Sequence, residues 1–227
     1  MKVLLINGSP KGEKSDTLVV SNAFVKGICS EVCAQVETVD VSKLNIEFCK
    51  GCFSCWHNGG KCVIEDDLAL FIEKYVASDI VIWSLPLYYF SMPAKAKALM
   101  ERTLPLLKMK MILTEKGITH EMRVDTSGIK FVLICGAGFP DRGDIFRAVK
   151  TQFEFVYGKS ATCICVSQSP MFNNSSAKPV TAPFLHKVSL AGAQFAKNGS
   201  LNKETLKDLA KPMLAEEQYV AICNAHT

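Results

Sequence analysis

The sequence predicts an α/β fold in which five parallel strands, in the order 2-1-3-4-5, form one doubly wound sheet with helices on both faces. Two observations predict it. Short apolar runs alternate with stretches in which apolar residues recur at helical spacing, and this alternation is typical of a parallel sheet covered by helices. The 227 residues also suffice for one well-buried core. We expect residues 1–168 to form the sheet domain and residues 169–227 to form a linker with a C-terminal helical extension.

The five expected strands are short runs of apolar and β-branched residues. The first run, residues 3–6, is apolar throughout and ends at Asn7 and Gly8, a pattern typical of a strand buried on both faces. The other expected strands cover residues 36–41, 80–83, 130–135 and 161–166.

Three further segments depart from the alternation. Residues 106–128 exceed an ordinary connection and are expected to form a flap or an interface element. Residues 170–183 contain three prolines and an Asn/Ser cluster, and we expect an extended linker there. Two helices are expected to follow, at residues 184–197 and 203–221, with the second interrupted at Pro212.

The composition excludes several classes of protein. Lys and Arg outnumber Asp and Glu by 26 to 22, and no dense basic run makes this mild excess a nucleic-acid site. No apolar stretch approaches the roughly 18 residues of a membrane span, and the first apolar run is too short for a signal peptide. We therefore expect a cytoplasmic protein with neither nucleic acid nor membrane as a partner. Its ten cysteines are then expected to be thiols or metal ligands rather than disulfides.

The loop after the first strand is suited to bind a phosphate. In a doubly wound sheet, ligands bind beyond the carboxyl ends of the strands. Residues 9–17 follow the first strand, and their small side chains let the backbone approach an anion closely. Hydroxyl groups add donors, and the next helix presents the positive end of its dipole. Neither the Walker motif nor the dinucleotide motif fits this loop. The hydroxyl groups belong to Ser9, Ser15 and Thr17.

Two more loops at the same edge resemble parts of a ligand site. Residues 86–91 place an aromatic cluster after the third strand, where it can form a wall for a flat ring. Residues 136–138 follow the fourth strand, and their small side chains permit close approach of the backbone. Three such loops at one sheet edge indicate a phosphate-bearing ligand with a flat ring.

These loops also carry a family resemblance. Gly-Ser-Pro-Lys followed by Ser-x-Thr is similar to the phosphate loop of NADPH-dependent FMN reductases and their flavodoxin-like relatives, and residues 86–94 resemble the flavin-ring loop of that family. The resemblance covers roughly residues 1–168. One departure is Asp16, where relatives usually carry Asn or Gly, and this acid is tolerable beside a phosphate only if its side chain points away.

The resemblance implies noncovalently bound FMN, with NAD(P)H as the co-substrate. It places Ser9, Lys11, Ser15 and Thr17 at the phosphate. Backbone N–H groups of residues 136–138 are expected to stabilise the negative charge of the reduced flavin. The residues that the resemblance places around the ring are Pro86, Leu87, Tyr88, Tyr89, Phe90, Ser91, Gly136, Ala137 and Gly138.

A second motif is a cluster of four cysteines with the spacing C-x2-C-x2-C-x6-C: Cys49, Cys52, Cys55 and Cys62. An even spread of the ten cysteines would place roughly 0.6 in a window of this length. Four thiolates suit a 4Fe–4S cluster or a tetrahedral zinc, and the two consecutive x2 spacings favour the cluster. The loop resembles that of iron–sulfur flavoproteins, which form oligomers. Structural thiols, zinc and redox disulfide chemistry stay open as alternatives.

The leading functional hypothesis is an FMN-dependent NAD(P)H oxidoreductase that passes electrons to a flavin, a quinone or a similar acceptor. A flavin carries the chemistry itself, so no dedicated catalytic acid–base pair is expected. One alternative is an iron–sulfur flavoprotein that acts as an electron carrier with a 4Fe–4S cluster. Another is a redox or metal sensor that reports through the cysteine loop. We also expect a homodimer or a higher homo-oligomer with a small-molecule or protein electron acceptor.

Overall fold

The computed structural model describes residues 1–114, 117–140 and 144–225 of the chain. Its centre is a parallel sheet of five strands in the order β2-β1-β3-β6-β7, and β4 and β5 form a separate pair. Counted among the sheet strands alone, this order is 2-1-3-4-5, so the predicted topology is confirmed. The sheet strands are β1 (Lys2–Asn7), β2 (Gln35–Asp40), β3 (Ile80–Pro86), β6 (Lys130–Gly136) and β7 (Thr162–Val166).

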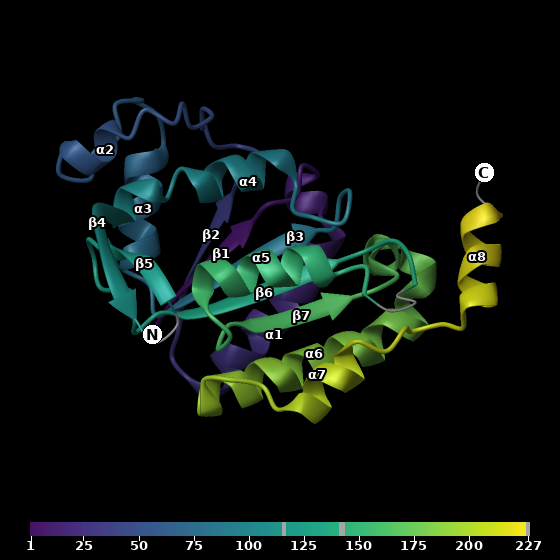
Figure 1. Ribbon diagram of the computed structural model, residues 1–227. Helices are drawn as coiled ribbons and strands as arrows, with labels where there is room; N and C mark the ends of the chain where they lie inside the picture. The colour runs from purple at the N-terminus through teal and green to yellow at the C-terminus, as the bar shows by residue number, and fades with distance from the viewer. Residues whose placement is uncertain (115–116, 141–143, 226–227) are drawn as a thin grey trace.

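Helices cover both faces of this sheet (Figure 1). Successive residues of a strand point to opposite faces. In β1, accordingly, Val3 and Leu5 belong to one apolar core, and Leu4 and Ile6 belong to the other. One face packs against α1 (Asp16–Glu31) and α6 (Lys178–Asn198), and the other packs against α3 (Leu68–Val76), α4 (Ala94–Glu101) and α5 (Arg147–Tyr157).

Two glycines let α1 and α6 pack in direct backbone contact. A Cβ atom on Gly27 would lie 1.8 Å from the carbonyl oxygen of Ser189, and one on Gly192 would lie 1.9 Å from that of Phe24. Neither position has room for a larger residue. The segment after residue 168 is therefore part of the packing of one sheet face, and the division of the chain at residue 168 stays a prediction.

The expectation of an extended linker over residues 170–183 is wrong. The structure has 3-10 turns η3 (Ser169–Asn173) and η4 (Ser175–Ala177), and then the start of α6. Pro179 misled the prediction because it lies in the first turn of α6, where a missing N–H costs no helical hydrogen bond. The predicted interruption at Pro212 is confirmed, since it separates α7 (Lys203–Leu209) from α8 (Glu216–Asn224).

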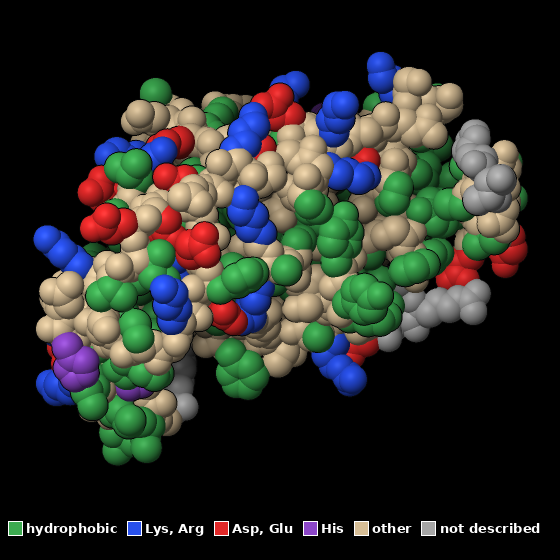
Figure 2. All heavy atoms as spheres, turned by 90° about the horizontal axis from the view of Figure 1, so that it is seen from above, with side chains coloured by type: hydrophobic (Ala, Val, Ile, Leu, Met, Phe, Trp, Pro, Cys, Tyr) green, Lys and Arg blue, Asp and Glu red, His purple; other side chains and the backbone are tan. Residues whose placement is uncertain are grey.

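Strands β4 (Leu107–Thr114) and β5 (Gly117–Met122) form an antiparallel pair outside the sheet. Most of its large apolar side chains are exposed. Figure 2 shows hydrophobic side chains grouped with histidines at this end of the molecule. The expected interface role of this segment stays a prediction. No helix in the described part of the chain is long and apolar enough to cross a membrane. The exposed apolar residues include Met109, Met111, Leu113 and Ile118.

Candidate functional site

The loop between β1 and α1 is braced from beneath by Asn7, the last residue of β1. Its buried side chain donates to the carbonyl oxygen of Gly12 at 2.8 Å and accepts from the N–H of Ser9 at 3.3 Å. The 3-10 turn η1 (Gly12–Lys14) begins at the first of these contacts. Ser15 then caps α1, because its Oγ accepts from the N–H of Leu18 at 3.3 Å. The loop is thus fixed in shape before any ligand binds.

Three hydroxyl side chains of this loop are buried at the N-terminus of α1. Ser9, Ser15 and Thr17 are 2%, 1% and 2% exposed. Thr17 also approaches the third predicted loop, since a Cβ atom on Gly136 would lie 2.9 Å from Thr17 Oγ1. A phosphate site needs hydrogen-bond donors and room for the anion. The hydroxyl groups and the helix N-terminus supply the donors, and Gly136 has no side chain that would fill the space beside Thr17. The residues present therefore fit the phosphate end of a flavin mononucleotide.

The acid in this loop is neutralised by its neighbours. Asp16 accepts a hydrogen bond from Lys11 Nζ at 2.7 Å through Oδ2 and from Asn173 Nδ2 at 2.9 Å through Oδ1. The bond to Asp16 raises the pKa of Lys11 above its ordinary value, against the opposing effect of burial. The ammonium group of Lys11, predicted as a phosphate ligand, is thus shared with a carboxylate.

The second predicted loop is a tight turn with two aromatic residues at its tip. Tyr88 and Ser91 exchange two backbone hydrogen bonds of 2.9 Å. Between them, Tyr89 and Phe90 have φ of 47° and 61°, the geometry of a type I′ turn, which normally carries Asn or Gly. Tyr89 is 100% exposed and Phe90 57% exposed. Strained backbone and exposed aromatic rings together are typical of a functional site.

The second and third loops are joined by a hydrogen bond of 2.7 Å from the N–H of Leu87 to the carbonyl oxygen of Gly136. The next residue, Ala137, donates its N–H to the carbonyl oxygen of Val166 at 2.8 Å. The expectation that this N–H serves a reduced flavin is therefore wrong, because the neighbouring strand already uses it. Gly138 lies farther out, and a Cβ atom there would make only an ordinary contact of 3.7 Å with Pro170.

The segment directly after β7 completes this edge of the sheet, and the sequence analysis assigned it no role. The buried side chain of Gln168 accepts from the N–H groups of Met213 and Leu214 at 2.9 and 3.0 Å. It also donates to the carbonyl oxygen of Leu214 at 2.9 Å. These bonds tie down the chain before α8, which lies at the end of the molecule toward which β7 points (Figure 1). The rule that ligand loops follow strand ends could have directed attention here.

Beside α8 lies a cavity of about 420 Å³. One side of it is formed by the two residues that follow the third loop, and the other side is formed by the first turns of α8. The C-terminal helix is thus close to the third of the predicted loops. The cavity is lined by Phe139, Pro140, Glu216, Glu217 and Val220.

The four clustered cysteines line one small cavity beside the short helix α2 (Ser54–His57). Cys55 is buried, Cys62 is half-buried, and Cys49 and Cys52 are exposed. The cavity measures about 20 Å³, room for one water molecule. Among the described residues, no three Cys, His, Asp or Glu side chains stand close enough together to hold a metal ion. The donor set suits a metal centre, and the loop would have to spread on its exposed side to admit one.

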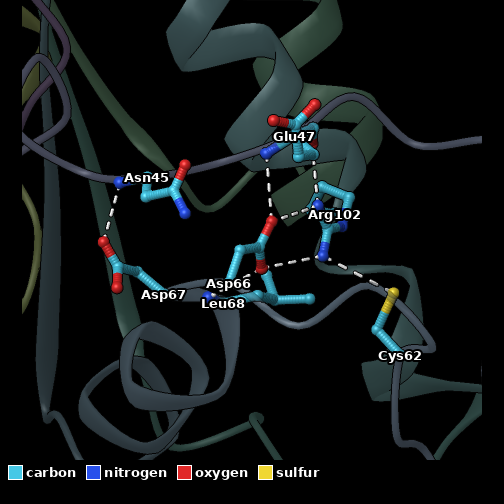
Figure 3. A network of polar contacts seen from close by, with 7 residues as sticks. All are labelled: Asn45, Glu47, Cys62, Asp66, Asp67, Leu68 and Arg102. Carbon is cyan, nitrogen blue, oxygen red and sulfur yellow. Dashed lines mark hydrogen bonds and ion pairs between the residues drawn. The ribbon is translucent and has the colours of Figure 1, made fainter.

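A buried ion pair supports this cysteine loop (Figure 3). Arg102, which follows the last residue of α4, donates to the two carboxylate oxygens of Asp66 at 2.7 and 3.0 Å. It also donates to the carbonyl oxygen of Glu47 at 2.7 Å, and its Nη2 lies 3.5 Å from Cys62 Sγ. Asp66 further accepts from the N–H groups of Glu47 and Leu68. Burial alone would raise the pKa of Asp66, but these bonds hold it below its usual range.

Comparison with known proteins agrees with this architecture. The chain belongs to the flavodoxin-like family, because the family described as "Flavodoxin-like fold" matches residues 1–158. The predicted family is thus confirmed. An iron–sulfur flavoprotein of Methanocaldococcus jannaschii is 34% identical over 106 residues, which are 47% of this chain and 53% of the relative. An iron–sulfur flavoprotein of Clostridioides difficile is 25% identical over 190 residues, 75% of this chain and 82% of the relative. The chain spans about half the length of the first of these relatives.

Solved structures share the fold. An FMN-dependent NADH-azoreductase from Bacillus anthracis superimposes with a TM-score of 0.59 at 16% identity, over 86% of this chain and 99% of the other. An NAD(P)H:quinone oxidoreductase from Methanothermobacter marburgensis superimposes with a TM-score of 0.62 at 16% identity, over 86% and 96% of the two chains. At these identities the likeness establishes the fold alone.

Proposed function

We propose that the chain is an FMN-dependent oxidoreductase that takes electrons from NAD(P)H and passes them to a flavin, a quinone or a similar small acceptor. The observation that carries this proposal is the strained aromatic turn at Tyr89 and Phe90. Just before this turn, Leu87 is hydrogen-bonded to Gly136, and Gly136 lies beside the buried hydroxyl of Thr17. A flat ring with a phosphate tail matches such an arrangement. The names of the structural neighbours support the same class of reaction.

Each part of the site has a separate task in this proposal. The hydroxyls of Ser9 and Thr17 and the N-terminus of α1 bind the phosphate. Tyr89 and Phe90 cover the ring and exclude water from it. When bound, FMN supplies the capacity to accept hydride and to release electrons one or two at a time. The protein contributes binding and orientation, and no proton transfer by a side chain is required.

The test is reconstitution of the apoprotein with FMN, followed by anaerobic oxidation of NADH and NADPH with flavin, quinone and azo acceptors. We expect stoichiometric FMN and steady-state turnover. Tyr89→Gly is the informative variant, because glycine relieves the positive φ, which costs about 1 kcal/mol or more. It should leave the apoprotein at least as stable as the wild type and weaken FMN binding. An apoprotein that takes up no FMN contradicts the proposal.

A second candidate function is an iron–sulfur flavoprotein that acts as an electron carrier. The specific observation is that all four clustered cysteines line one cavity with Arg102 beside them. Curated relatives named iron–sulfur flavoproteins support this candidate. Anaerobic purification with an iron and sulfide assay separates the candidates. Fewer than about one iron per chain excludes a four-cysteine cluster, whereas about four irons with slow NAD(P)H oxidation favours the carrier.

We further propose that the protein is a homodimer or a larger homo-oligomer. The exposed apolar side chains of Met111, Leu113 and Ile118 on the β4–β5 pair support this assignment, because contiguous exposed apolar surface is typical of interfaces. Light scattering after size-exclusion chromatography tests it. Replacement of Leu113 by Glu should shift the protein toward the monomer, whereas a mass that is already monomeric in the wild type contradicts the assignment.

A further inference from the structure

The segment after β7 lies directly against the loop between β1 and α1. Asn173, the last residue of η3, donates through Nδ2 to the carbonyl oxygen of Lys14 and to Asp16 Oδ1, both at 2.9 Å. These bonds join positions that are 159 and 157 residues apart in the chain. The C-terminal part of the chain therefore borders the predicted phosphate site.

The same segment also fixes the position of α8. Gln168 immediately precedes η3, and its buried side chain accepts from the N–H groups of Met213 and Leu214. Its backbone has a φ of 58°, in the left-handed region that residues other than glycine rarely adopt. Such strain persists only where the surrounding structure imposes it, and it is frequent at ligand sites. The placement of α8 at this edge of the sheet is thus built into the fold.

One residue of α8 is buried. Tyr219 is 6% exposed and is the only buried residue among the nine of this helix, all of which the structure describes, whereas Val220 and Ile222 are exposed. Among the described residues, Tyr219 belongs to neither of the two apolar cores that cover the sheet. Burial raises the pKa of Tyr219, and the nearby Cys223 thiol and Asp16 carboxylate raise it further. Its hydroxyl therefore stays protonated near the phosphate loop, where it can donate a hydrogen bond.

A phosphate monoester needs more donors than the side chains of this loop supply. It presents three strongly accepting oxygens, and each hydroxyl group of the loop has one hydrogen to donate. The ammonium group of Lys11 is shared with Asp16 at 2.7 Å. A neutral donor from outside the loop would therefore complete the contacts of the phosphate without changing the charge of the site.

We propose that Tyr219 is a ligand of the FMN phosphate, with its hydroxyl donating to a phosphate oxygen and α8 covering this end of the flavin site. The inference rests on the FMN-dependent function proposed above and assigns a residue of the C-terminal helix to that site. Asp16 does not require this hydroxyl, because its two oxygens already accept from Lys11 and Asn173.

The experiment compares FMN with riboflavin, which has the same ring and ribityl chain but no phosphate. The apoprotein of the full chain is titrated with each flavin, and flavin fluorescence gives the two Kd values. Tyr219→Phe removes the hydroxyl and keeps the ring. Tyr75→Phe is the matched control, since Tyr75 is also buried but packs against Phe71 and Phe131 in an apolar core.

We expect Tyr219→Phe to raise the Kd for FMN about tenfold, the usual effect of losing a hydrogen bond to a charged group. The Kd for riboflavin should stay unchanged, and Tyr75→Phe should match the wild type with both flavins. Gln168→Leu displaces α8 and should also weaken the binding of FMN. The double variant should bind FMN no more weakly than the weaker single variant, because both changes remove the same contact.

Other results overturn the inference. An unchanged Kd for FMN in Tyr219→Phe excludes the hydroxyl from the site. Equal losses for FMN and riboflavin, or a loss that comes with a lowered melting temperature of the apoprotein, make Tyr219 a structural residue. If the wild-type apoprotein binds neither flavin, the proposed function itself fails. Binding by the wild type thus distinguishes failure of the proposed function from failure of the Tyr219 assignment.

Discussion

The ammonium group of Lys11 lies 2.7 Å from the carboxylate of Asp16, and Asn173 holds the other oxygen of that carboxylate. This arrangement explains how an acid can stand at the start of α1 beside a predicted phosphate site. Asp16 is only 8% exposed, and its charge is balanced within the protein before a ligand arrives.

Asp16→Asn should tighten FMN binding. The change removes a negative charge near the phosphate and frees Lys11 to pair with it. The Lys11 side chain is half-exposed, so solvent screens its pairing and limits the gain to about 1 kcal/mol, or about fivefold in Kd. Titration of the apoprotein with FMN, followed by flavin fluorescence, measures the change. Lys11→Met serves as the comparison and should weaken binding only slightly in the wild-type background. Weaker binding by Asp16→Asn would show that the carboxylate itself supports the ligand.

Gly136→Ala should weaken FMN binding far more than Gly138→Ala. A Cβ atom at Gly136 would lie 2.8 Å from Ser169 Cβ and 2.9 Å from Thr17 Oγ1, whereas one at Gly138 would meet Pro170 at an ordinary 3.7 Å. We expect a loss of at least about tenfold in affinity for the first variant, since overpacking typically costs about 1–3 kcal/mol. Kd values of the two apoproteins are the measurement. Equal affinities would separate Gly136 from the ligand site.

The Asp66–Arg102 pair should make stability depend on acid pH. The folded-state pKa of Asp66 is lowered, so its stabilisation is present above the unfolded pKa of about 3.9 and is lost as the pH falls through the folded value. Asp66→Asn should lower the free energy of unfolding by about 3 kcal/mol at pH 7, and the difference from the wild type should shrink below about pH 4.

Urea denaturation at pH 7, 5, 4 and 3 measures this difference. The control is Asp208→Asn, which removes a half-buried surface carboxylate that pairs with Lys187 and Lys211. It should leave the unfolding free energy near the wild-type value at every pH. A difference between Asp66→Asn and the wild type that is the same at all four pH values would mean that the pair contributes through packing alone.

Gln168→Leu should release the segment that carries α8. Leucine fills the buried position without hydrogen-bonding groups, and the N–H groups of Met213 and Leu214 then lose their partner. Hydrogen exchange over residues 213–224 should become at least about tenfold faster, because loss of buried bonds costs about 1–3 kcal/mol. Exchange in the sheet strands should stay unchanged. Slow exchange in the variant would mean that α8 is held by its apolar contacts instead.

The sheet could be predicted from the sequence because its central strands β1, β3 and β6 are short apolar runs, and their burial on both faces needs no distant information. β1 and β6 differ from their predicted runs by one or two residues. The loops of the site were also accessible, since Gly136 is the last residue of β6 and residues 9–17 come soon after the end of β1. The family comparison confirms the resulting fold.

The remaining features depend on residues far apart in the chain. Asp16 is balanced by Asn173, which lies 157 positions away, and Asp66 is paired with Arg102, which follows a different helix. No local pattern encodes either pair. The N–H of Ala137 could not be assigned for the same reason, because the carbonyl oxygen that it binds belongs to a neighbouring strand. Its predicted place beside the ring stays a prediction. A proline such as Pro179 is compatible both with an extended linker and with the first turn of a helix, and the structure has the helix.

Helix α4 fixes the spacing between the two predicted redox sites. It begins three residues after the aromatic turn and ends one residue before Arg102, so its eight residues act as a rigid spacer of about 12 Å. Each residue of a helix turns the next by about 100°. A single inserted residue in α4 would therefore turn Arg102 away from Asp66. It would also lengthen the path between the predicted flavin site and the cysteines. The ion pair and the spacing of the two predicted sites would both change with one insertion. The length of this helix is therefore expected to tolerate little variation.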